Sequence, residues 1–597
     1  MDNQRNLILA IVLCLALLLG FELVVGKLYP TPPPSERVAA QADPAPEQVA
    51  AKHTREGGLT DPGEAAEEAR DLSTELAAAS RVAIDAPEVA GSINLVGARI
   101  DDIVLKTHRQ TVKRDSGPVR LFSPAGTPAQ QFAQFGWVAT GEAGQAVRLP
   151  DARTVWRADG GPLAPGKPVT LSWDNGQGQE FRIRFTIDEF YMLTAERTVV
   201  NRGTNAIAVR PYAFVNRTSR TASQDTWNVH SGPIGLFEGS VNFDWNYSDI
   251  DEEPAKVVAP EGRTGWLGFT DIYWLSALVP QPGAAVEGRF RALGDEHFRA
   301  EMLYAPVTLA PGNQATTTTQ LFAGAKESRV LDHYEDAGVP NFGLAIDWGW
   351  FRWFMYPIFW LLRQLFALTG NFGVAIILLT VIVRALMFPI AQKQFASMAA
   401  MRAVQPKMKA LQERYKDDKV QQQQALAKLY KDEGVNPLAG CLPIFLQIPI
   451  FFALYKTLLV AIEMRHKPFV LWIRDLSAQD PAMILNAFGL LNFTPPSFLS
   501  IGILAVMLGV TMWLQFRLNP AAMDPVQQQM FMIMPWVMMF VMAPFAAGLL
   551  LYWITSNVLT LGQQKYLYSR HPQLKAQAEK DAVDKTRATE RGRLDGT

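Results

Sequence analysis

The chain has 597 residues, a formal charge of −1 and a near-average composition, which exclude a small one-domain protein and give no sign of a basic nucleic-acid-binding protein. Its two cysteines, Cys14 and Cys441, both lie in apolar runs, which excludes a disulfide framework. The sequence contains no CxxC pair, HExxH motif or phosphate-binding glycine loop. We therefore expect no metal site, no cofactor and no nucleotide hydrolysis.

The first apolar run, residues 7–25, is long enough to cross a bilayer. A cleaved signal peptide is the alternative interpretation, because an Ala-x-Ala pattern occurs at residues 40–42. That pattern lies well beyond the run, and Arg5 is the one basic residue before it. We expect an uncleaved transmembrane anchor over residues 1–28. Residues 29–90 are rich in proline, alanine and glutamate and predict a flexible periplasmic tether.

From about Ile93 the apolar residues alternate with a period of two. Residues 181–188, FRIRFTID, alternate over their whole length, as a half-buried strand does. Similar short segments, separated by glycine, asparagine and proline turns, continue to about Phe322. We predict an antiparallel β-sandwich domain over residues 91–340. A sandwich of this size can bind a sugar, but no catalytic constellation stands out in it.

Residues 347–368 combine tryptophan, phenylalanine and tyrosine with two arginines. This stretch is too interrupted to span a membrane and too apolar for solution. We predict an amphipathic helix over residues 345–370 that lies in the outer membrane interface, with aromatic rings at the headgroup level. Pro357 is expected to break or kink it.

Five further apolar stretches follow and, with the first run, predict six transmembrane helices. Five of these helices form a core over residues 371–567, and the last two are close enough in sequence to make a tight helical hairpin. The five stretches are residues 372–390, 438–462, 498–516, 530–543 and 545–561.

Lysine and arginine in the connecting segments set the orientation. Residues 391–435 contain nine and the chain after Gln564 contains eight, whereas residues 463–497 contain three. We therefore expect both termini in the cytoplasm, with residues 568–597 as a basic tail, and the large domain in the periplasm. The predicted fold class is a multidomain, polytopic α-helical protein of the bacterial inner membrane with a large periplasmic antiparallel β-sandwich domain.

A basic cytoplasmic helical hairpin is predicted for residues 392–432. Apolar residues recur every three or four positions over residues 392–416, interrupted by Pro406, and a second helix follows over residues 420–431. Two interpretations are open: the helices pack on each other, or they dock a ribosome, a targeting factor or an emerging hydrophobic chain. The candidate docking residues are Met398, Met401, Arg402, Lys407, Lys409 and Arg414.

Arg384 lies within the predicted span 372–390, where a charge costs on the order of 3 kcal/mol or more. It precedes Ile390 by six residues, which places it roughly 9 Å from the cytoplasmic edge. Its side chain either snorkels to the interface or faces a water-filled cavity open to the cytoplasm. Thr380 lies one turn earlier on the same face. No aspartate or glutamate lies at this depth in the predicted spans, so an unpaired cation would suit acidic or polar segments of a client chain.

Four segments resemble the YidC/Oxa/Albino family of membrane protein insertases, in its Gram-negative form. The resemblance is dense over residues 345–570 and architectural over residues 30–340. The segments are VIVRALMFPIAQKQFASMAAMRAVQPKMKALQERYKDDK, VNPLAGCLPIFLQIPIFFALYKTL, FVLWIRDLSAQDP and GLLLYWITSNVLTLGQQ.

The resemblance implies a hydrophilic groove in the five-helix core, open to the cytoplasm and to lipid. The family's groove arginine matches Arg384, its threonine matches Thr380, and its aromatic pair matches Tyr552 and Trp553. With Gln447, a polar residue of the next span, these are the candidate groove residues. The implied activity is the insertion, folding and assembly of inner-membrane proteins, without bond-making chemistry. The implied partners are nascent membrane proteins, the Sec translocon, the ribosome, the signal recognition particle pathway and membrane lipids.

Two other functions are alternatives to membrane protein insertion. A secondary transporter predicts polar residues in several spans and internal repeats, and the sequence shows neither. A membrane-anchored periplasmic sugar-binding protein predicts a cluster of carboxylates or histidines within residues 90–340, and none stands out.

Overall fold

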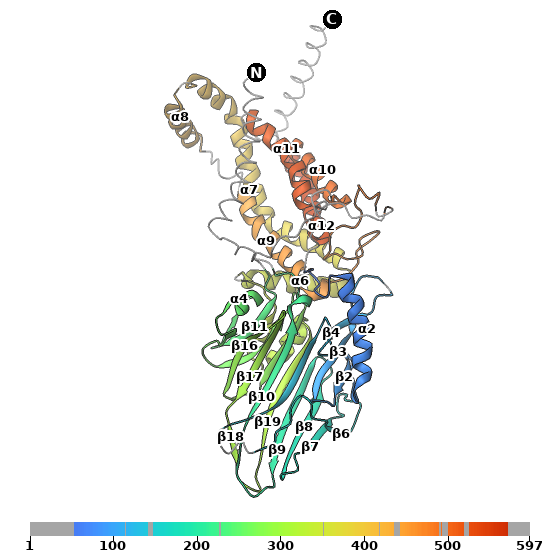
Figure 1. Ribbon diagram of the computed structural model, residues 1–597. Helices are drawn as coiled ribbons and strands as arrows, with labels where there is room; N and C mark the ends of the chain where they lie inside the picture. Colours follow the sequence, from blue (N-terminus) through green and yellow to red (C-terminus); the bar gives the residue numbers. More distant parts are fainter. Residues whose placement is uncertain are drawn as a thin grey trace, which may run out of the picture.

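The computed structural model divides into a β domain at one end and a group of helices at the other (Figure 1). The expected N-terminal anchor and nearly all of the expected C-terminal tail lie outside the residues that the structure describes. Those residues are 53–113, 115–140, 147–225, 229–349, 351–416, 418–434, 442–488, 491, 500–518 and 525–570.

Two antiparallel sheets build the β domain. The first has the order β1-β2-β3-β5-β10-β17-β16-β13, with β4 paired to β3 and β18 to β10. Its strands are β1 (Arg81–Asp85), β2 (Val89–Asn94), β3 (Arg99–Arg109), β4 (Pro118–Phe122), β5 (Gln131–Ala139), β10 (Ile207–Thr218), β13 (Val257–Val258), β16 (Val286–Gly294), β17 (His297–Tyr304) and β18 (Val307–Leu309).

The second sheet has the order β12-β11-β14-β15-β19-β9-β8-β7-β6. Its strands are β6 (Arg157–Asp159), β7 (Val169–Asp174), β8 (Gln179–Ile187), β9 (Met192–Asn201), β11 (Gly232–Phe237), β12 (Ser240–Asn242), β14 (Thr264–Thr270), β15 (Trp274–Pro280) and β19 (Gln314–Ala325). Alternate residues of β8 are buried, as the alternating sequence predicted. The predicted antiparallel β domain is therefore confirmed, although its first strand begins before residue 91.

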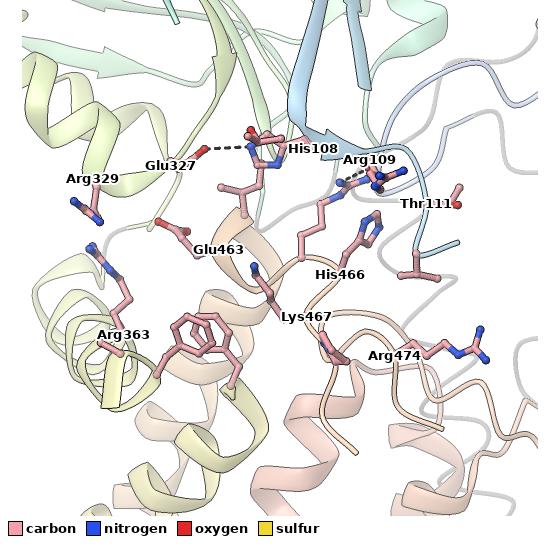
Figure 2. A pocket seen from close by; sticks show the side chains of 18 of the residues that line it. His108, Arg109, Thr111, Glu327, Arg329, Arg363, Glu463, His466, Lys467 and Arg474 are labelled. Atoms are coloured by element: carbon pink, nitrogen blue, oxygen red, sulfur yellow. Dashed lines mark hydrogen bonds and ion pairs between the residues drawn. The ribbon is translucent and has the colours of Figure 1, made fainter. Parts of the chain in front are cut away.

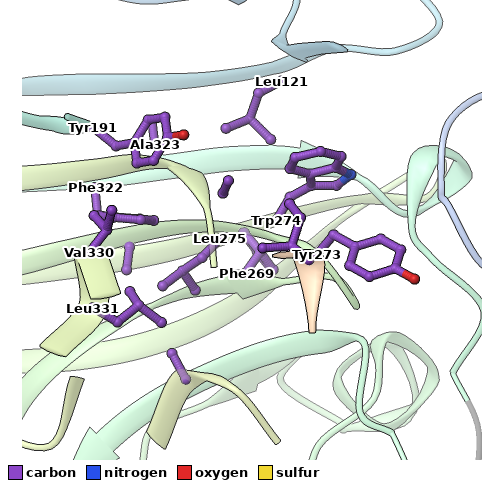
Figure 3. Packing of buried hydrophobic residues seen from close by; sticks show 14 of the residues in the cluster. Leu121, Tyr191, Phe269, Tyr273, Trp274, Leu275, Phe322, Ala323, Val330 and Leu331 are labelled. Carbon is purple, nitrogen blue, oxygen red and sulfur yellow. The ribbon is translucent and has the colours of Figure 1, made fainter. Parts of the chain in front are cut away.

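The sandwich core continues into the segment that leads to the membrane. Phe322 of β19 contacts the ring of Tyr191 edge-on at 5.8 Å and that of Phe342 at 5.3 Å. Helix α5 (Ser328–Asp336) buries Val330 and Leu331 beside them (Figure 3). Two short helices, α4 (Tyr247–Glu252) and the 3-10 helix η2 (Phe342–Ala345), complete this end of the domain. Aromatic packing thus connects the sheets to the segment that leads into the helical region.

The prediction of a flexible tether over residues 29–90 is wrong in its second half. Helix α2 (Pro62–Ala78) lies beside the first sheet, and β1 and β2 follow it (Figure 1). Asp61 begins the helix by accepting hydrogen bonds from the N–H groups of Gly63 and Glu64 at 2.6 and 3.0 Å. Glu68 accepts a 2.8 Å bond from the N–H of Ala129. Alanine and glutamate favour a helix, and these contacts fix it to the sheet, which composition alone does not reveal.

The helical region begins with α6 (Arg352–Thr369), which lies between the β domain and the remaining helices (Figure 1). Pro357 does not break α6, so the expected break there is wrong, and α7 (Phe372–Arg414) likewise continues through Pro406. A proline removes one helical hydrogen bond, and in α6 the buried side chains on either side of Pro357, Met355 and Phe359, hold the helix in place. The other helices are α8 (Lys419–Asp432), α9 (Leu442–Val460), α10 (Ile503–Leu518), α11 (Pro525–Met542) and α12 (Ala547–Arg570).

Among the described residues, one stretch is both long and apolar enough to span a membrane, namely Phe372–Gln392 in α7. Three shorter apolar helical stretches accompany it: Gln447–Val460, Ile503–Arg517 and Met532–Met542. These lie within or close to the predicted spans, while the count of six spans stays a prediction. The expected first hairpin helix is the direct continuation of the first core helix, because α7 runs for 43 residues.

Candidate functional site

Arg384 on α7 contacts α12. Its Nε donates to the hydroxyl oxygen of Ser556 at 3.1 Å, and Nη2 donates to the same oxygen. Ser556 is buried at 1% exposure, whereas Arg384 is half-buried. Among the described residues no carboxylate forms a salt bridge with Arg384. The guanidinium is held in place by a neutral hydroxyl that leaves its charge uncompensated.

Gln447 and Tyr552 form a second contact between helices. Gln447 of α9 donates from Nε2 to the hydroxyl of Tyr552 on α12 at 2.5 Å, and Tyr552 is 2% exposed. Tyr552 and Ser556 lie one turn apart on α12, and Tyr552 is near enough to Arg384 to interact electrostatically. Arg384, Gln447, Tyr552 and Ser556 therefore form one polar cluster across α7, α9 and α12, which we call the groove cluster.

The structure keeps two of the predicted groove residues out of this cluster. The hydroxyl of Thr380 is buried and donates to the carbonyl of Ile376 in its own helix at 2.7 Å. The ring of Trp553 is half-buried and packs edge-on against Phe451 of α9 at 5.1 Å. Thr380 satisfies its own hydrogen-bonding need, and Trp553 joins α12 to α9 by apolar contact.

Two polar residues of α12 were missed by the sequence reasoning. Ser556 holds Arg384, and Asn557 donates from Nδ2 to the hydroxyl of Thr511 on α10 at 3.1 Å. Both side chains are buried. The position of Ser556 one turn after Tyr552 was a readable signal, because residues four apart on a helix share a face. Together they make α12 the helix that connects the polar positions of its neighbours.

The hairpin helices α7 and α8 pack on each other in the described part. Val404 and Met408 are buried, and the hydroxyl of Tyr430 on α8 donates to the sulfur of Met408 at 3.0 Å. Lys407 pairs with Glu433 at 2.5 Å, and Arg414 lies over the ring of Tyr415. These contacts support the interpretation in which the two helices of the hairpin pack on each other. The side chains of Met398, Met401, Arg402 and Lys409 lie outside the described ones.

Within the described residues no group of three or more histidine, cysteine, aspartate or glutamate side chains is placed to hold a metal ion. The side chains that meet at the groove cluster are a guanidinium, an amide, a phenol and a hydroxyl. Such groups bind polar and acidic partners by hydrogen bonding. The cluster is therefore suited to recognition and solvation of a polar segment.

Comparison with known proteins matches both halves of the chain. The family described as 60Kd inner membrane protein matches residues 364–575, and the family described as YidC periplasmic domain matches residues 81–361. The protein named membrane protein insertase YidC in Zymomonas mobilis is 45% identical over 571 residues, covering 95% of this chain and 96% of that protein. The protein of the same name in Methylorubrum extorquens is 42% identical and covers 96% of each chain.

A crystal structure of an active YidC insertase with its first transmembrane domain resolved aligns with 81% of this chain and 91% of its own. The sequence identity is 17% and the TM-score is 0.35, and both values are too low to establish a common fold. The sequence relatives decide the assignment, because they are similar over nearly the full length of both proteins. The chain belongs to the YidC family of membrane protein insertases.

Proposed function

We propose that this chain inserts membrane proteins by holding polar client segments beside the groove cluster while apolar segments move into lipid. The observation that carries the proposal is Arg384, a half-buried charge in an apolar helix whose partner is the neutral hydroxyl of Ser556. A charge in the bilayer costs on the order of 3 kcal/mol or more unless water or an opposite charge compensates it.

The mechanism that we propose is solvation without bond-making chemistry. A client's polar groups lose their hydration on entering hydrocarbon, and this loss is the main barrier to translocation. The donors of Arg384 and Gln447, together with water held near them, would replace part of that hydration. Acidic groups of the client would gain a charge-assisted hydrogen bond with the guanidinium. Apolar client residues gain nothing from the groove cluster and would leave for lipid.

The hairpin is proposed to receive clients on the cytoplasmic side. Helix α7 has 43 residues and is roughly 64 Å long, about twice the thickness of the hydrocarbon core. Its second half therefore projects beyond the membrane and carries α8 with it. Residues 391–435 contain nine lysines and arginines, a charge suited to ribosomal RNA and to anionic lipid. We propose the ribosome, the signal recognition particle pathway and the Sec translocon as partners, with both termini cytoplasmic.

Family membership places the chain in a membrane with its β domain in the periplasm, since the match over residues 81–361 is to a periplasmic domain. It also favours insertion over the transporter and the sugar-binding alternatives. The arrangement in Figure 1 agrees with this topology, because α6 lies between the β domain and the apolar helices while α8 lies at the opposite end.

The proposal is tested by depleting the native insertase and complementing with variants, with insertion of a small phage-coat-like client as the measurement. Arg384→Ala is expected to reduce insertion at least about tenfold, and Arg384→Lys to retain most of it because the charge remains. Leu386→Ala is the matched control, since Leu386 is 76% exposed on the same helix. Full insertion by both Arg384→Ala and a deletion of residues 392–432 would contradict the groove model.

A further inference from the structure

A large open cavity lies where the β domain meets the helices. Its volume is about 1260 Å³, and it is bounded by the end of β3, the start of α5, the helix α6 and the 3-10 helix η4 (Ile462–Met464) with the loop after it (Figure 2). None of its lining residues belongs to the groove cluster. Insertion as proposed above gives this cavity no role.

The cavity wall is strongly basic. Seven lysines and arginines line it, against three glutamates. Arg329, Lys467 and Arg474 are exposed, and within the described part of the chain none of them forms a salt bridge with a carboxylate. The side chains of Arg329 and Arg363 point toward one another (Figure 2). Two guanidinium groups that converge in this way repel each other unless an anion lies between them.

Each glutamate of the wall has a hydrogen-bond partner nearby, and Glu88 accepts a bond from the hydroxyl of Thr107. Glu327 accepts a hydrogen bond from the hydroxyl of Tyr191 at 2.7 Å and pairs with His108 at 3.1 Å. Glu463 accepts bonds from the N–H and the hydroxyl of Ser328 at 2.9 and 2.7 Å. Burial raises the pKa of Glu463, which favours its neutral form. Arg465 pairs with Glu56 and Arg363 donates to the hydroxyl of Ser328 at 2.9 Å, but seven basic residues against three glutamates leave the wall with a net positive charge.

Another part of the wall is apolar and lies at the membrane boundary. Phe366 of α6 and Phe372, the first residue of α7, stack with their ring centroids 3.9 Å apart. Helix α9 ends at Val460, just before η4, so the cavity is level with the outer ends of α7 and α9. Trp353 and Trp360 of α6 are 70% and 54% exposed, as expected for aromatic rings at the headgroup level. The cavity thus combines a cationic wall with an aromatic one at the depth of lipid headgroups.

We propose that this cavity binds the phosphate headgroup of an anionic phospholipid from the outer leaflet. Arg329, Arg363 and Lys467 contact the phosphate, and the Phe366–Phe372 wall receives the glycerol and the first part of the acyl chains. Arginine and lysine are strong phosphate ligands, and a basic pocket beside transmembrane helices is a typical headgroup site. An acidic peptide matches the charge but makes no use of the aromatic wall.

The test is native mass spectrometry of the full-length protein in detergent, titrated with phosphatidylglycerol or with phosphatidylcholine. We expect tighter binding of phosphatidylglycerol, and the double variant Arg329→Gln/Lys467→Gln is expected to weaken it at least about tenfold. The matched control is Arg157→Gln/Lys167→Gln, which removes two exposed basic residues from the far end of the β domain and should leave binding unchanged. Unfolding temperatures of all variants show whether they are folded.

Three results would overturn the proposal. One is equal affinity for the two lipids, and another is unchanged binding by the double variant. The third is displacement of the lipid by millimolar inorganic phosphate or by an acidic peptide, which would make the cavity a site for a soluble anion or for a client segment. None of these readouts depends on insertion, so a failure here is distinguishable from a failure of the groove model.

Discussion

The β domain contains a buried arginine and the helices contain a half-buried one, and the two have different partners. Arg217 on β10 is 2% exposed and pairs with Asp271 at 2.8 Å, and Asp271 accepts a further bond from the N–H of Ser223 at 2.7 Å. Arg384 on α7 is half-buried and contacts the hydroxyl of Ser556. The first charge is compensated by a carboxylate within the protein, whereas the second has a neutral partner, and we propose that water or a client compensates it.

A carboxylate is not the sole way to satisfy a buried guanidinium. Arg197 on β9 is fully buried, donates to the hydroxyl of Thr319 at 2.5 Å and to the carbonyl of Tyr212, and lies near the rings of Phe135 and Tyr304. It is enclosed on several sides. The three arginines therefore differ in how many groups contact the guanidinium, and Arg384 has the fewest.

The largest effect on stability is expected for Arg217→Met. The variant leaves the carboxylate of Asp271 buried without its partner, which should lower the free energy of unfolding by about 3–5 kcal/mol. Denaturant unfolding of the full-length protein in detergent measures the change, with the exposed Arg157→Met as control. A loss below about 1 kcal/mol would mean that the β domain also tolerates an unpaired buried charge.

The next effect is a pH dependence from Lys326, which is buried at the end of β19 and donates to the hydroxyl of Thr270 at 2.9 Å. Burial lowers the pKa of Lys326 from 10.5 to about 8. Between these values the unfolded chain holds a proton that the folded chain does not, so the unfolding free energy rises with pH, by about 3 kcal/mol in total. Lys326→Met should abolish this rise, and identical slopes for both proteins would refute it.

A smaller effect is expected within the groove cluster. The hydrogen bond from Gln447 to Tyr552 should contribute about 1 kcal/mol to stability. A double-mutant cycle with Gln447→Leu and Tyr552→Phe measures this coupling directly. A coupling energy of zero would show that the two side chains do not interact, and the groove cluster would then shrink to Arg384 and Ser556.

The smallest effect is expected for Lys407→Ala in the hairpin. The salt bridge of Lys407 with Glu433 is largely exposed, so its loss should change the unfolding free energy by less than about 1 kcal/mol. The same variant removes one charge from a candidate docking surface. Cosedimentation with ribosomes should weaken while stability stays the same, and the reverse outcome would assign Lys407 to hairpin packing alone.

Secondary-structure elements with a clear local sequence pattern were predicted correctly. The period-two alternation of β8 and the aromatic stretch of α6 both correspond to the expected elements. Helix α2 was missed because a proline-, alanine- and glutamate-rich composition resembles a linker, although the Asp61–Pro62 start was a readable helix signal. The continuity of α7 was missed because the change from apolar to basic composition near residue 391 indicates a membrane boundary, and a helix can cross such a boundary unbroken.

The contacts of the site depend on long-range packing. Arg384 was singled out from its apolar surroundings, but its partner Ser556 is 172 residues away in the chain. No local periodicity pairs the two. The same holds for Gln447 and Tyr552, which are 105 residues apart. The sequence identified Arg384 as a charge that is costly to place in a bilayer, and the structure shows that α12 faces it.

In the proposed mechanism the charge of Arg384 contributes more to client insertion than to the stability of the fold. The most direct test measures two quantities on purified Arg384→Ala, namely client insertion into proteoliposomes and the free energy of unfolding. We expect at least about a tenfold loss of insertion with a stability change below about 1 kcal/mol, because the guanidinium is half-buried and has no carboxylate partner among the described residues. Unchanged insertion, or a stability loss as large as that of Arg217→Met, would contradict this mechanism.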